Sequence, residues 1–189
     1  EVGNDLDMAT KCLQRLNRTN DIDDFREEVI KVHRKNWRLL FAAAQNYING
    51  QSWGYIIAGK YHRGRHRGGG RRVNSYARDR IRALQLMVEA MKQAKDEKDT
   101  REVAGFYIKF ADMLARYRGY SQAWRLQYLS DLSKLPDHGE GGGYYYYYHG
   151  DKGAPVHPDG TPVYHGIPKS YEAAKSDGER RRLLLFQAT

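Results

Sequence analysis

Apolar residues recur every three or four positions over most of the first 135 residues, the spacing that gathers them on one face of an α-helix. The pattern predicts six helices in this part of the chain, over residues 5–17, about 21–34, 36–49, about 75–91, 100–116 and about 121–135. Helices need a capping side chain at the start, and the candidates are Asn74 or Ser75, Ser121, and the pair Asp99 and Glu102. The first 135 residues are therefore predicted to be helical.

Glycine and proline mark the breaks in this pattern. Residues 59–72 contain five glycines and no apolar period, which predicts a loop, and Pro136 ends the last of the six helices. Residues 136–169 hold all five prolines, and the turn sequence at 158–161, flanked by Val156 and Val163, favours a small hairpin. A final helix is predicted after Ser176. Because the chain stops inside its apolar stretch, we expect it to be a fragment of a longer protein.

The order of these elements predicts a mainly α fold built from about three helix pairs and a C-terminal helix. Residues 104–136 match a tetratricopeptide (TPR) unit best, with large side chains and the small Ala111 and Ala123 at the positions where two helix backbones approach closely. The predicted organisation is a TPR-like helical-repeat domain over 1–135 with a basic loop insertion at 59–73, a Gly/Tyr/Pro-rich structured loop over 136–169, and a further helix over 170–189. The alternative is a non-repetitive helical bundle with the same apolar stripes.

Composition places the chain among ordinary globular proteins, with 40% hydrophobic and 29% charged residues. Its single cysteine, Cys12, excludes an intrachain disulfide and a Cys-rich zinc site, and its place on the apolar stripe of the first helix predicts that it packs as a small hydrophobe. This cysteine content is compatible with the cytoplasm and with the periplasm.

The charge is concentrated in one segment. Residues 60–82 hold nine Lys or Arg and one acid, whereas the whole chain has a net charge of +9. The anion- or partner-binding residues predicted here are Lys60, His62, Arg63, Arg65, His66, Arg67, Arg71 and Arg72. Two uses remain open: contacts with the phosphates of a nucleic acid, and bidentate pairing with carboxylates of the same chain. The first two helices supply the possible partners: Asp5, Asp7, Asp21, Asp23, Asp24, Glu27 and Glu28.

Three other features carry weaker predictions. His62 and His66 are four residues apart but lie in a glycine-rich segment, so solvated histidines are favoured over a metal site. The five consecutive tyrosines are a candidate stacking platform for sugars or bases, or else they pin the loop to the helices: Tyr144, Tyr145, Tyr146, Tyr147 and Tyr148. No nucleophile, phosphate-loop or dinucleotide motif is present, which favours a non-enzymatic protein without cofactors.

Several strings together resemble a known family, the large bacterial alpha-2-macroglobulin-like proteins, in the helical region that precedes their macroglobulin domains. The strings are KCLQRLNRTNDIDDF, NWRLLFAAAQNYI, AGKYHRGRHRGGGRRVNSYARDRIRALQLM, RGYSQAWRLQYLSDLSKLPD and GAPVHPDGTPVYHGIPKSYEAAKSDGERRR. The resemblance implies an extracytoplasmic location, periplasmic or secreted, and an accessory role beside a protease trap. The family's Cys-x-Glu-Gln thioester is not matched, because Leu13-Gln14-Arg15 follow Cys12.

The sequence thus predicts a non-enzymatic interaction or scaffold domain whose partners are downstream domains of the same polypeptide or another protein. The alternative is a nucleic-acid-binding protein that uses residues 60–82. A third hypothesis is a surface module that holds anionic glycans through the basic segment and the tyrosine run.

Overall fold

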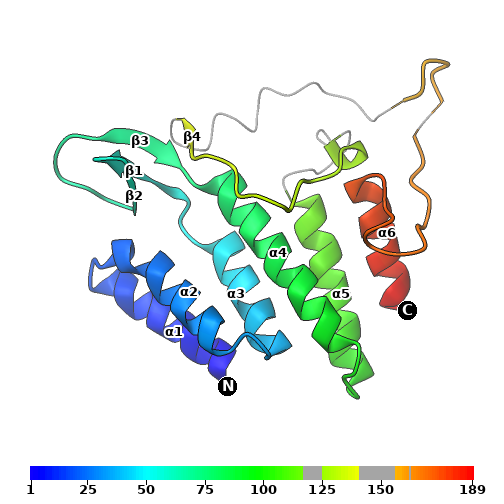
Figure 1. Cartoon of the computed structure of the whole chain (residues 1–189), viewed down its shortest axis with the longest axis horizontal. Coiled ribbons are helices and arrows are strands. Elements are labelled where there is room, and N and C mark those ends of the chain that lie inside the picture. The colour runs from blue at the N-terminus through cyan, green and yellow to red at the C-terminus, as the bar shows by residue number, and fades with distance from the viewer. Residues whose placement is uncertain (117–124, 141–155, 162) are drawn as a thin grey trace. The chain divides into compact units, whose positions relative to one another are not determined.

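The computed structural model describes residues 1–116, 125–140, 156–161 and 163–189. Within these residues the protein is mainly helical, with a small antiparallel sheet (Figure 1). The chain forms two compact units. We call residues 1–96 with 132–145 the helix–sheet unit, and residues 97–131 with 146–189 the two-helix unit. The mainly α fold class is confirmed at this level.

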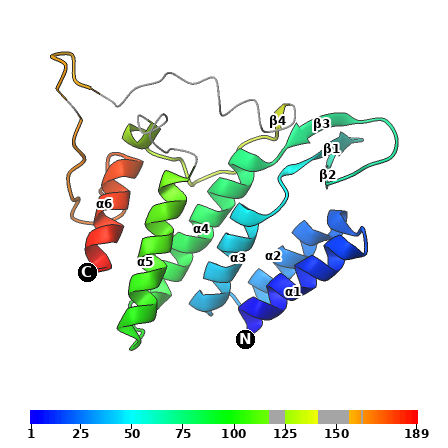
Figure 2. The same cartoon turned by 180° about the vertical axis from the view of Figure 1, so that it is seen from behind.

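Four helices build the helix–sheet unit: α1 (Val2–Arg15), α2 (Ile22–Val32), α3 (Trp37–Asn49) and α4 (Tyr76–Ala94). α3 packs against α1, α2 and α4, and the views from both sides show these helices next to one another (Figure 2). Ala43 and Ala44 of α3 are fully buried, as are Leu84 and Met87 of α4. Small residues let the α3 backbone lie close to its neighbours while larger side chains of α4 fill the remaining space.

The apolar stripe predicted for α2 consists of Ile22, Phe25, Val29 and Val32, and only Ile22 is fully buried. The sequence pattern favours Phe25 and Val32 as core residues, but the structure buries Ile22, Arg26 and Ile30, and Val32 is 77% exposed. The reason is tertiary: Arg26 finds polar partners inside the unit, which turns that face of the helix inward. A guanidinium with partners on both sides can be buried, and hydropathy alone gives no indication of this.

The prediction for Cys12 is also wrong. Cys12 is exposed, and so is Leu16 at the end of the same helix. α1 turns Leu6 and Thr10 inward instead, and the Thr10 hydroxyl donates to the carbonyl oxygen of Leu6 at 2.8 Å. The second half of the predicted stripe of α1 therefore faces solvent.

The predicted loop at 59–72 contains two strands, which corrects the sequence analysis. β1 (Trp53–Ile57), β2 (Lys60–Arg63), β3 (Arg71–Asn74) and the two-residue β4 (Gly139–Glu140) form an antiparallel sheet in the order β2-β1-β3-β4. Ala58 and Gly59 both have positive φ, 48° and 80°, as a tight two-residue hairpin turn requires. β2 and β3 consist mostly of charged and polar residues, so they lack the apolar alternation that would have revealed them.

The two-helix unit contains α5 (Thr100–Ala115) packed on α6 (Asp177–Gln187). Phe106, Phe110 and Leu114 of α5 and Leu184 of α6 are buried. Both predicted caps are confirmed: the Asp99 side chain accepts from the backbone N–H of Glu102, and the Ser176 side chain accepts from that of Glu179.

The helix predicted over 121–135 is wrong where it can be assessed. Residues 121–124 lie outside the described residues, and 125–135 contain a single 3-10 turn at 125–127 instead of an α-helix. The polar groups here bind α6: Asp177 N–H donates to the carbonyl oxygen of Tyr128 at 2.9 Å, and its carboxylate accepts from Ser130 N–H at 3.0 Å. The TPR match at 104–136 thus lacks its second α-helix in the described part.

The turn predicted at 158–161 is present. His157 N–H donates to the carbonyl oxygen of Thr161 at 2.7 Å, and the Asp159 carboxylate accepts from Thr161 N–H at 2.9 Å. Val163 is not in a strand, so the small predicted hairpin reduces to a turn with an isolated bridge at Val156. Within the described residues, the helices are too short or too polar to cross a membrane.

Candidate functional site

The sheet has two faces, and its register decides which side chains share each face. Tyr55 of β1 lies opposite His62 of β2 and Arg72 of β3, so these three side chains project to one side. Gly54 lies opposite Arg63 and Val73, and this second set is buried. We call the buried side the inner face and the Tyr55 side the outer face.

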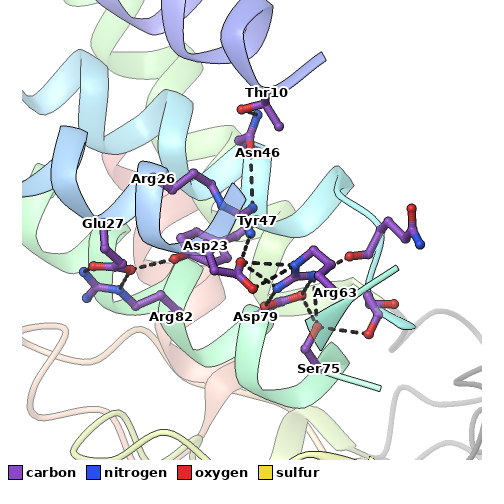
Figure 3. A network of polar contacts seen from close by, with 12 residues as sticks. Thr10, Asp23, Arg26, Glu27, Asn46, Tyr47, Arg63, Ser75, Asp79 and Arg82 are labelled. Atoms are coloured by element: carbon purple, nitrogen blue, oxygen red, sulfur yellow. Dashed lines mark hydrogen bonds and ion pairs between the residues drawn. The ribbon is translucent and has the colours of Figure 1, made fainter. Parts of the chain in front are cut away.

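Arg63 is the centre of the inner face. Its side chain is only 4% exposed, and its guanidinium makes a bidentate pair with Asp79 of α4, both N–O distances being 2.9 Å. The Nε of the same group donates to Asp23 of α2 at 3.0 Å, and its Nη1 donates to the Ser75 hydroxyl at 3.0 Å (Figure 3). It also donates to the backbone carbonyl of Gln51. One arginine of the hairpin therefore connects the sheet to two helices.

The network continues from Asp23 into the helices. Arg26, 1% exposed, pairs with Asp23, donates to the Asn46 side-chain oxygen at 3.2 Å, and lies 3.8 Å from the centre of the Tyr47 ring. The Asn46 amide in turn donates to Asp7 of α1 at 2.7 Å. Polar contacts thus run through α1, α2, α3 and the sheet, as the dashed lines of Figure 3 show in part.

A second branch surrounds Glu27. Its carboxylate accepts two bonds from Arg82 of α4, each of 2.7 Å, and one from the Tyr47 hydroxyl at 2.6 Å. This fork geometry is the strong form of a charge-assisted pair. The predicted pairing of loop arginines with carboxylates of the first two helices is confirmed for Arg63, which binds Asp23. The pair of Arg82 with Glu27 was not predicted.

The ion pairs shift the pKa values of their members. Burial alone raises the pKa of Asp23, but the charges of Arg63 and Arg26 and their hydrogen bonds outweigh it and hold the pKa below its usual value. Burial likewise raises the pKa of Glu27, and the hydrogen bonds from Arg82 and Tyr47 bring it below the usual value. Both carboxylates are therefore charged in the folded protein at neutral pH.

The free energy of unfolding is expected to fall as the pH drops below about 4, the ordinary pKa of Asp and Glu. A lowered folded-state pKa contributes stability that is complete above the unfolded-state pKa and is lost as the pH falls through the folded-state value. Urea unfolding at a series of pH values between 7 and 2 measures this loss. Asp23→Asn should flatten the acid limb, whereas the exposed neighbour Asp24→Asn should not; equal profiles for the two variants would contradict the assignment.

A half-open pocket of about 520 Å³ adjoins the network. Its lining combines the paired groups above with Tyr61, His138, Lys60 and Arg78. The Tyr61 and His138 rings stack with centroids 4.2 Å apart, and Arg78 donates to the backbone carbonyl of Pro136 at 3.1 Å. Burial, and secondly the charge of Arg78, lower the pKa of His138, so this imidazole is neutral at pH 7. The volume is within the range of small-molecule and side-chain pockets.

The outer face carries an aromatic and cationic cluster. The Tyr55 ring is 6.5 Å from Trp53 and 6.0 Å from His66, and the His62 and His66 rings are 6.3 Å apart. The Arg72 guanidinium lies 5.9 Å from the centre of the Trp53 ring. The four rings are half-buried, whereas Arg72 is exposed. We call these five residues the outer-face cluster.

The structure separates the predicted site residues into three groups. Arg63 is buried in ion pairs, His62, His66 and Arg72 join the outer-face cluster, and the remaining four are exposed: Lys60, Arg65, Arg67 and Arg71. Among the described residues, no three His, Cys, Asp or Glu side chains converge in a way that could hold a metal ion. The predicted tyrosine platform, residues 144–148, lies outside the described residues.

Sequence reasoning missed Arg26, Tyr47 and Asp79 as members of the network. The spacing of Arg26 indicated its burial, because it lies four residues after Ile22 and four before Ile30, on the same face of the helix as these two buried residues. Asp79, the one acid among residues 60–82, is 5% exposed and faces Arg63. Its isolation in a cationic segment is a sequence signal for an internal pair.

Comparison with protein-family models, curated proteins and solved structures finds no match to this chain. Function is therefore argued from the network, the pocket and the outer face.

Proposed function

We propose that this chain is a non-enzymatic, TPR-like protein-interaction or scaffold domain that receives an acidic segment of a partner in the pocket beside Tyr61. The proposal rests on the charges that line the pocket, where the acidic side chains are paired with arginines and further cations remain. Asp23, Glu27 and Asp79 are all held by arginine donors, which orders the walls. Lys60 and Arg78 add positive charge beyond these pairs, and they suit a partner's carboxylate.

The pocket is also suited to a protein segment by its shape and its aromatic surface. It is half-open, so a side chain can enter while its backbone stays outside, and the stacked Tyr61 and His138 rings offer an apolar wall. Aromatic side chains and arginine are the residues most enriched at the centres of protein interfaces. The ordered ion pairs reduce the entropy that binding would otherwise have to remove.

The proposed context is an N-terminal accessory module of a larger extracytoplasmic protein of the alpha-2-macroglobulin-like kind, and the resemblance of the strings supports it. The packing of α3 against α4 supports the TPR-like part of the proposal. The coding sequence that follows residue 189 tests the context: the proposal requires macroglobulin-type β-sandwich domains there. A different downstream architecture would overturn this part while leaving the pocket proposal intact.

The pocket is tested with the segments that flank the chain in its gene, expressed separately and titrated by calorimetry. Lys60→Glu and Arg78→Glu are each expected to weaken binding at least tenfold, because each places a like charge against the partner's carboxylate. Lys98→Glu, an exposed site on the two-helix unit, is the matched control and should leave affinity unchanged. Equal loss in all three variants would indicate a non-specific charge effect and would overturn the proposal.

A further inference from the structure

We infer that the outer face of the sheet is a binding surface for single-stranded nucleic acid, in which bases stack on Tyr55 and its neighbouring rings and arginines hold the phosphates. This surface is on the opposite side of the sheet from the Arg63 network. The inference therefore stands independently of the pocket and its partner.

The first argument is the distribution of charge. Residues 50–78 contain no Asp or Glu, and among the described residues Arg63 binds two carboxylates, Asp23 and Asp79, on the inner face. Arg72, opposite Tyr55, is thereby separated from the acids of the inner face, whereas Arg71, opposite Ile56, lies on the side of Gly54. Arg65, Arg67, Arg71 and Arg72 are all exposed on a stretch of eight residues. Such a local concentration of arginine is the electrostatic footprint of a polyanion site.

The second argument is the presence of rings among these cations. Tyr55, Trp53, His62 and His66 lie within 6.5 Å of one another in successive pairs, and Arg72 lies over Trp53. A polyanion of the carboxylate or sulfate type needs cations alone. Nucleobases need flat surfaces as well, and rings on a β-sheet surface flanked by basic residues are a recurrent way of binding single strands.

The third argument is the shape of the connecting segment. Gly64, Gly68 and Gly70 have φ values of +87°, +129° and +142°, which other residues rarely adopt. At Gly70 a Cβ atom would lie 3.2 Å from the backbone oxygen of Ile56, so the backbone at this point runs close along β1. Three short strands at about 4.8 Å spacing form a face only about 10 Å wide, which suits one strand of two or three nucleotides.

The binding test uses fluorescence anisotropy with a labelled ten-nucleotide thymidine oligomer and the corresponding duplex, at two salt concentrations. The full chain is expected to bind the single strand more tightly than the duplex. The test variant replaces four arginines together by Gln: Arg65, Arg67, Arg71 and Arg72. It should weaken binding of the single strand at least tenfold. The log–log slope of its affinity against salt should become shallower by about 0.7 for each phosphate that the variant no longer neutralises. The matched control replaces four exposed cations of α1 and of the segment from α2 to α3 by Gln: Lys11, Arg15, Lys31 and Lys35.

The control variant lowers the net charge by the same amount and should change affinity by less than about threefold, because non-specific attraction alone is screened over about 10 Å. An equal weakening in both quadruple variants would overturn the inference. Tighter binding of the duplex than of the single strand would overturn it as well.

Stacking is tested at Tyr55. Tyr55→Ala is expected to weaken binding of the oligomer about 5- to 100-fold, and Tyr55→Phe, which keeps the ring, should restore it to within about twofold. Heparin and polyglutamate serve as polyanions without bases, and Tyr55→Ala should leave their binding unchanged. If Tyr55→Ala abolishes binding of all three ligands, or of none of them, the stacking role is overturned. If the unmodified chain binds polyglutamate more tightly than the oligomer, the surface is assigned to an acidic protein instead.

Trp53 provides a readout that does not depend on the folding of the Tyr55 variants. The oligomer is expected to quench part of the tryptophan fluorescence of the unmodified chain, and this part should be absent in Trp53→Phe. Quenching that is identical in the two proteins would place the bases elsewhere and overturn the inference.

Discussion

Arg63→Ala is expected to destabilise the helix–sheet unit by about 3–5 kcal/mol. The substitution removes one partner from a buried ionic cluster and leaves Asp79, 5% exposed, without the guanidinium that neutralises it. It also removes the donor that fixes Asp23 and the carbonyl of Gln51. A buried carboxylate without a partner must either take up a proton or draw in water. Both raise the free energy of the folded state, whereas the unfolded state, in which the carboxylate is hydrated, is unaffected.

Urea unfolding, monitored by hydrogen exchange of the α2 and α4 amides, measures this loss in the helix–sheet unit. The control is Arg65→Ala, two residues away in the same string, because Arg65 is exposed and its removal should change the free energy of unfolding by no more than about 0.5 kcal/mol. A similar loss in both variants would show that the hairpin is stabilised by its charge in general. The double variant Arg63→Met with Asp79→Leu should recover much of the stability, since it leaves neither charge unpaired.

Phe110→Ala is expected to destabilise the two-helix unit by about 3–5 kcal/mol. Phe110 is fully buried and stacks on Tyr171 with ring centroids 5.3 Å apart, and the Phe106 ring centroid is 6.1 Å away. Truncation would remove both ring contacts and leave a cavity between α5 and the segment that precedes α6. Because these rings fill much of a small core, the surroundings have little capacity to close over the gap.

Hydrogen exchange of the α5 amides, read as the free energy of opening, provides the measurement for this unit. Phe186→Ala is the matched control: it removes the same side chain from α6, but Phe186 is 63% exposed, so a change below about 0.5 kcal/mol is expected. If the two variants lose protection equally, Phe110 does not form the core of the unit. Global unfolding curves are less informative here, because the chain forms two compact units.

Periodicity predicted the helices well where one face is apolar and failed where polar contacts set the packing. α3, α4 and α5 begin and end within a few residues of the predicted bounds, and the caps at Asp99 and Ser176 are present. The described part of 121–135 is not an α-helix, and its polar groups bond to α6 instead. The backbone N–H and the hydroxyl of Ser130 both donate to the carboxylate of Asp177. A local pattern contains no information about a partner 47 residues away.

The site was predictable in kind and not in detail. The concentration of arginine between two helices, and the acidic residues on the two preceding helices, were sufficient to predict internal pairing, and Arg63 confirms it. The string from His62 to Arg67 contains three arginines with similar neighbours, and nothing in it distinguishes Arg63 from Arg65 or Arg67. Hairpin register makes the distinction, because a shift of one residue would place Arg63 on the other face.

The sequence by itself determined the mainly helical class, the position of the basic segment and the approximate ends of the main helices, since these follow from residue spacing and capping chemistry within a few turns. The tertiary structure decided that this segment is a hairpin with a buried face and an exposed face, and which of its cations belong to each. The physical reason is that burial of a charge depends on partners brought from α2 and α4, which lie 40 and 16 residues from Arg63 in the chain. Those partners keep Arg63 on the inner face, whereas Arg72, opposite Tyr55, lies over the Trp53 ring on the outer face.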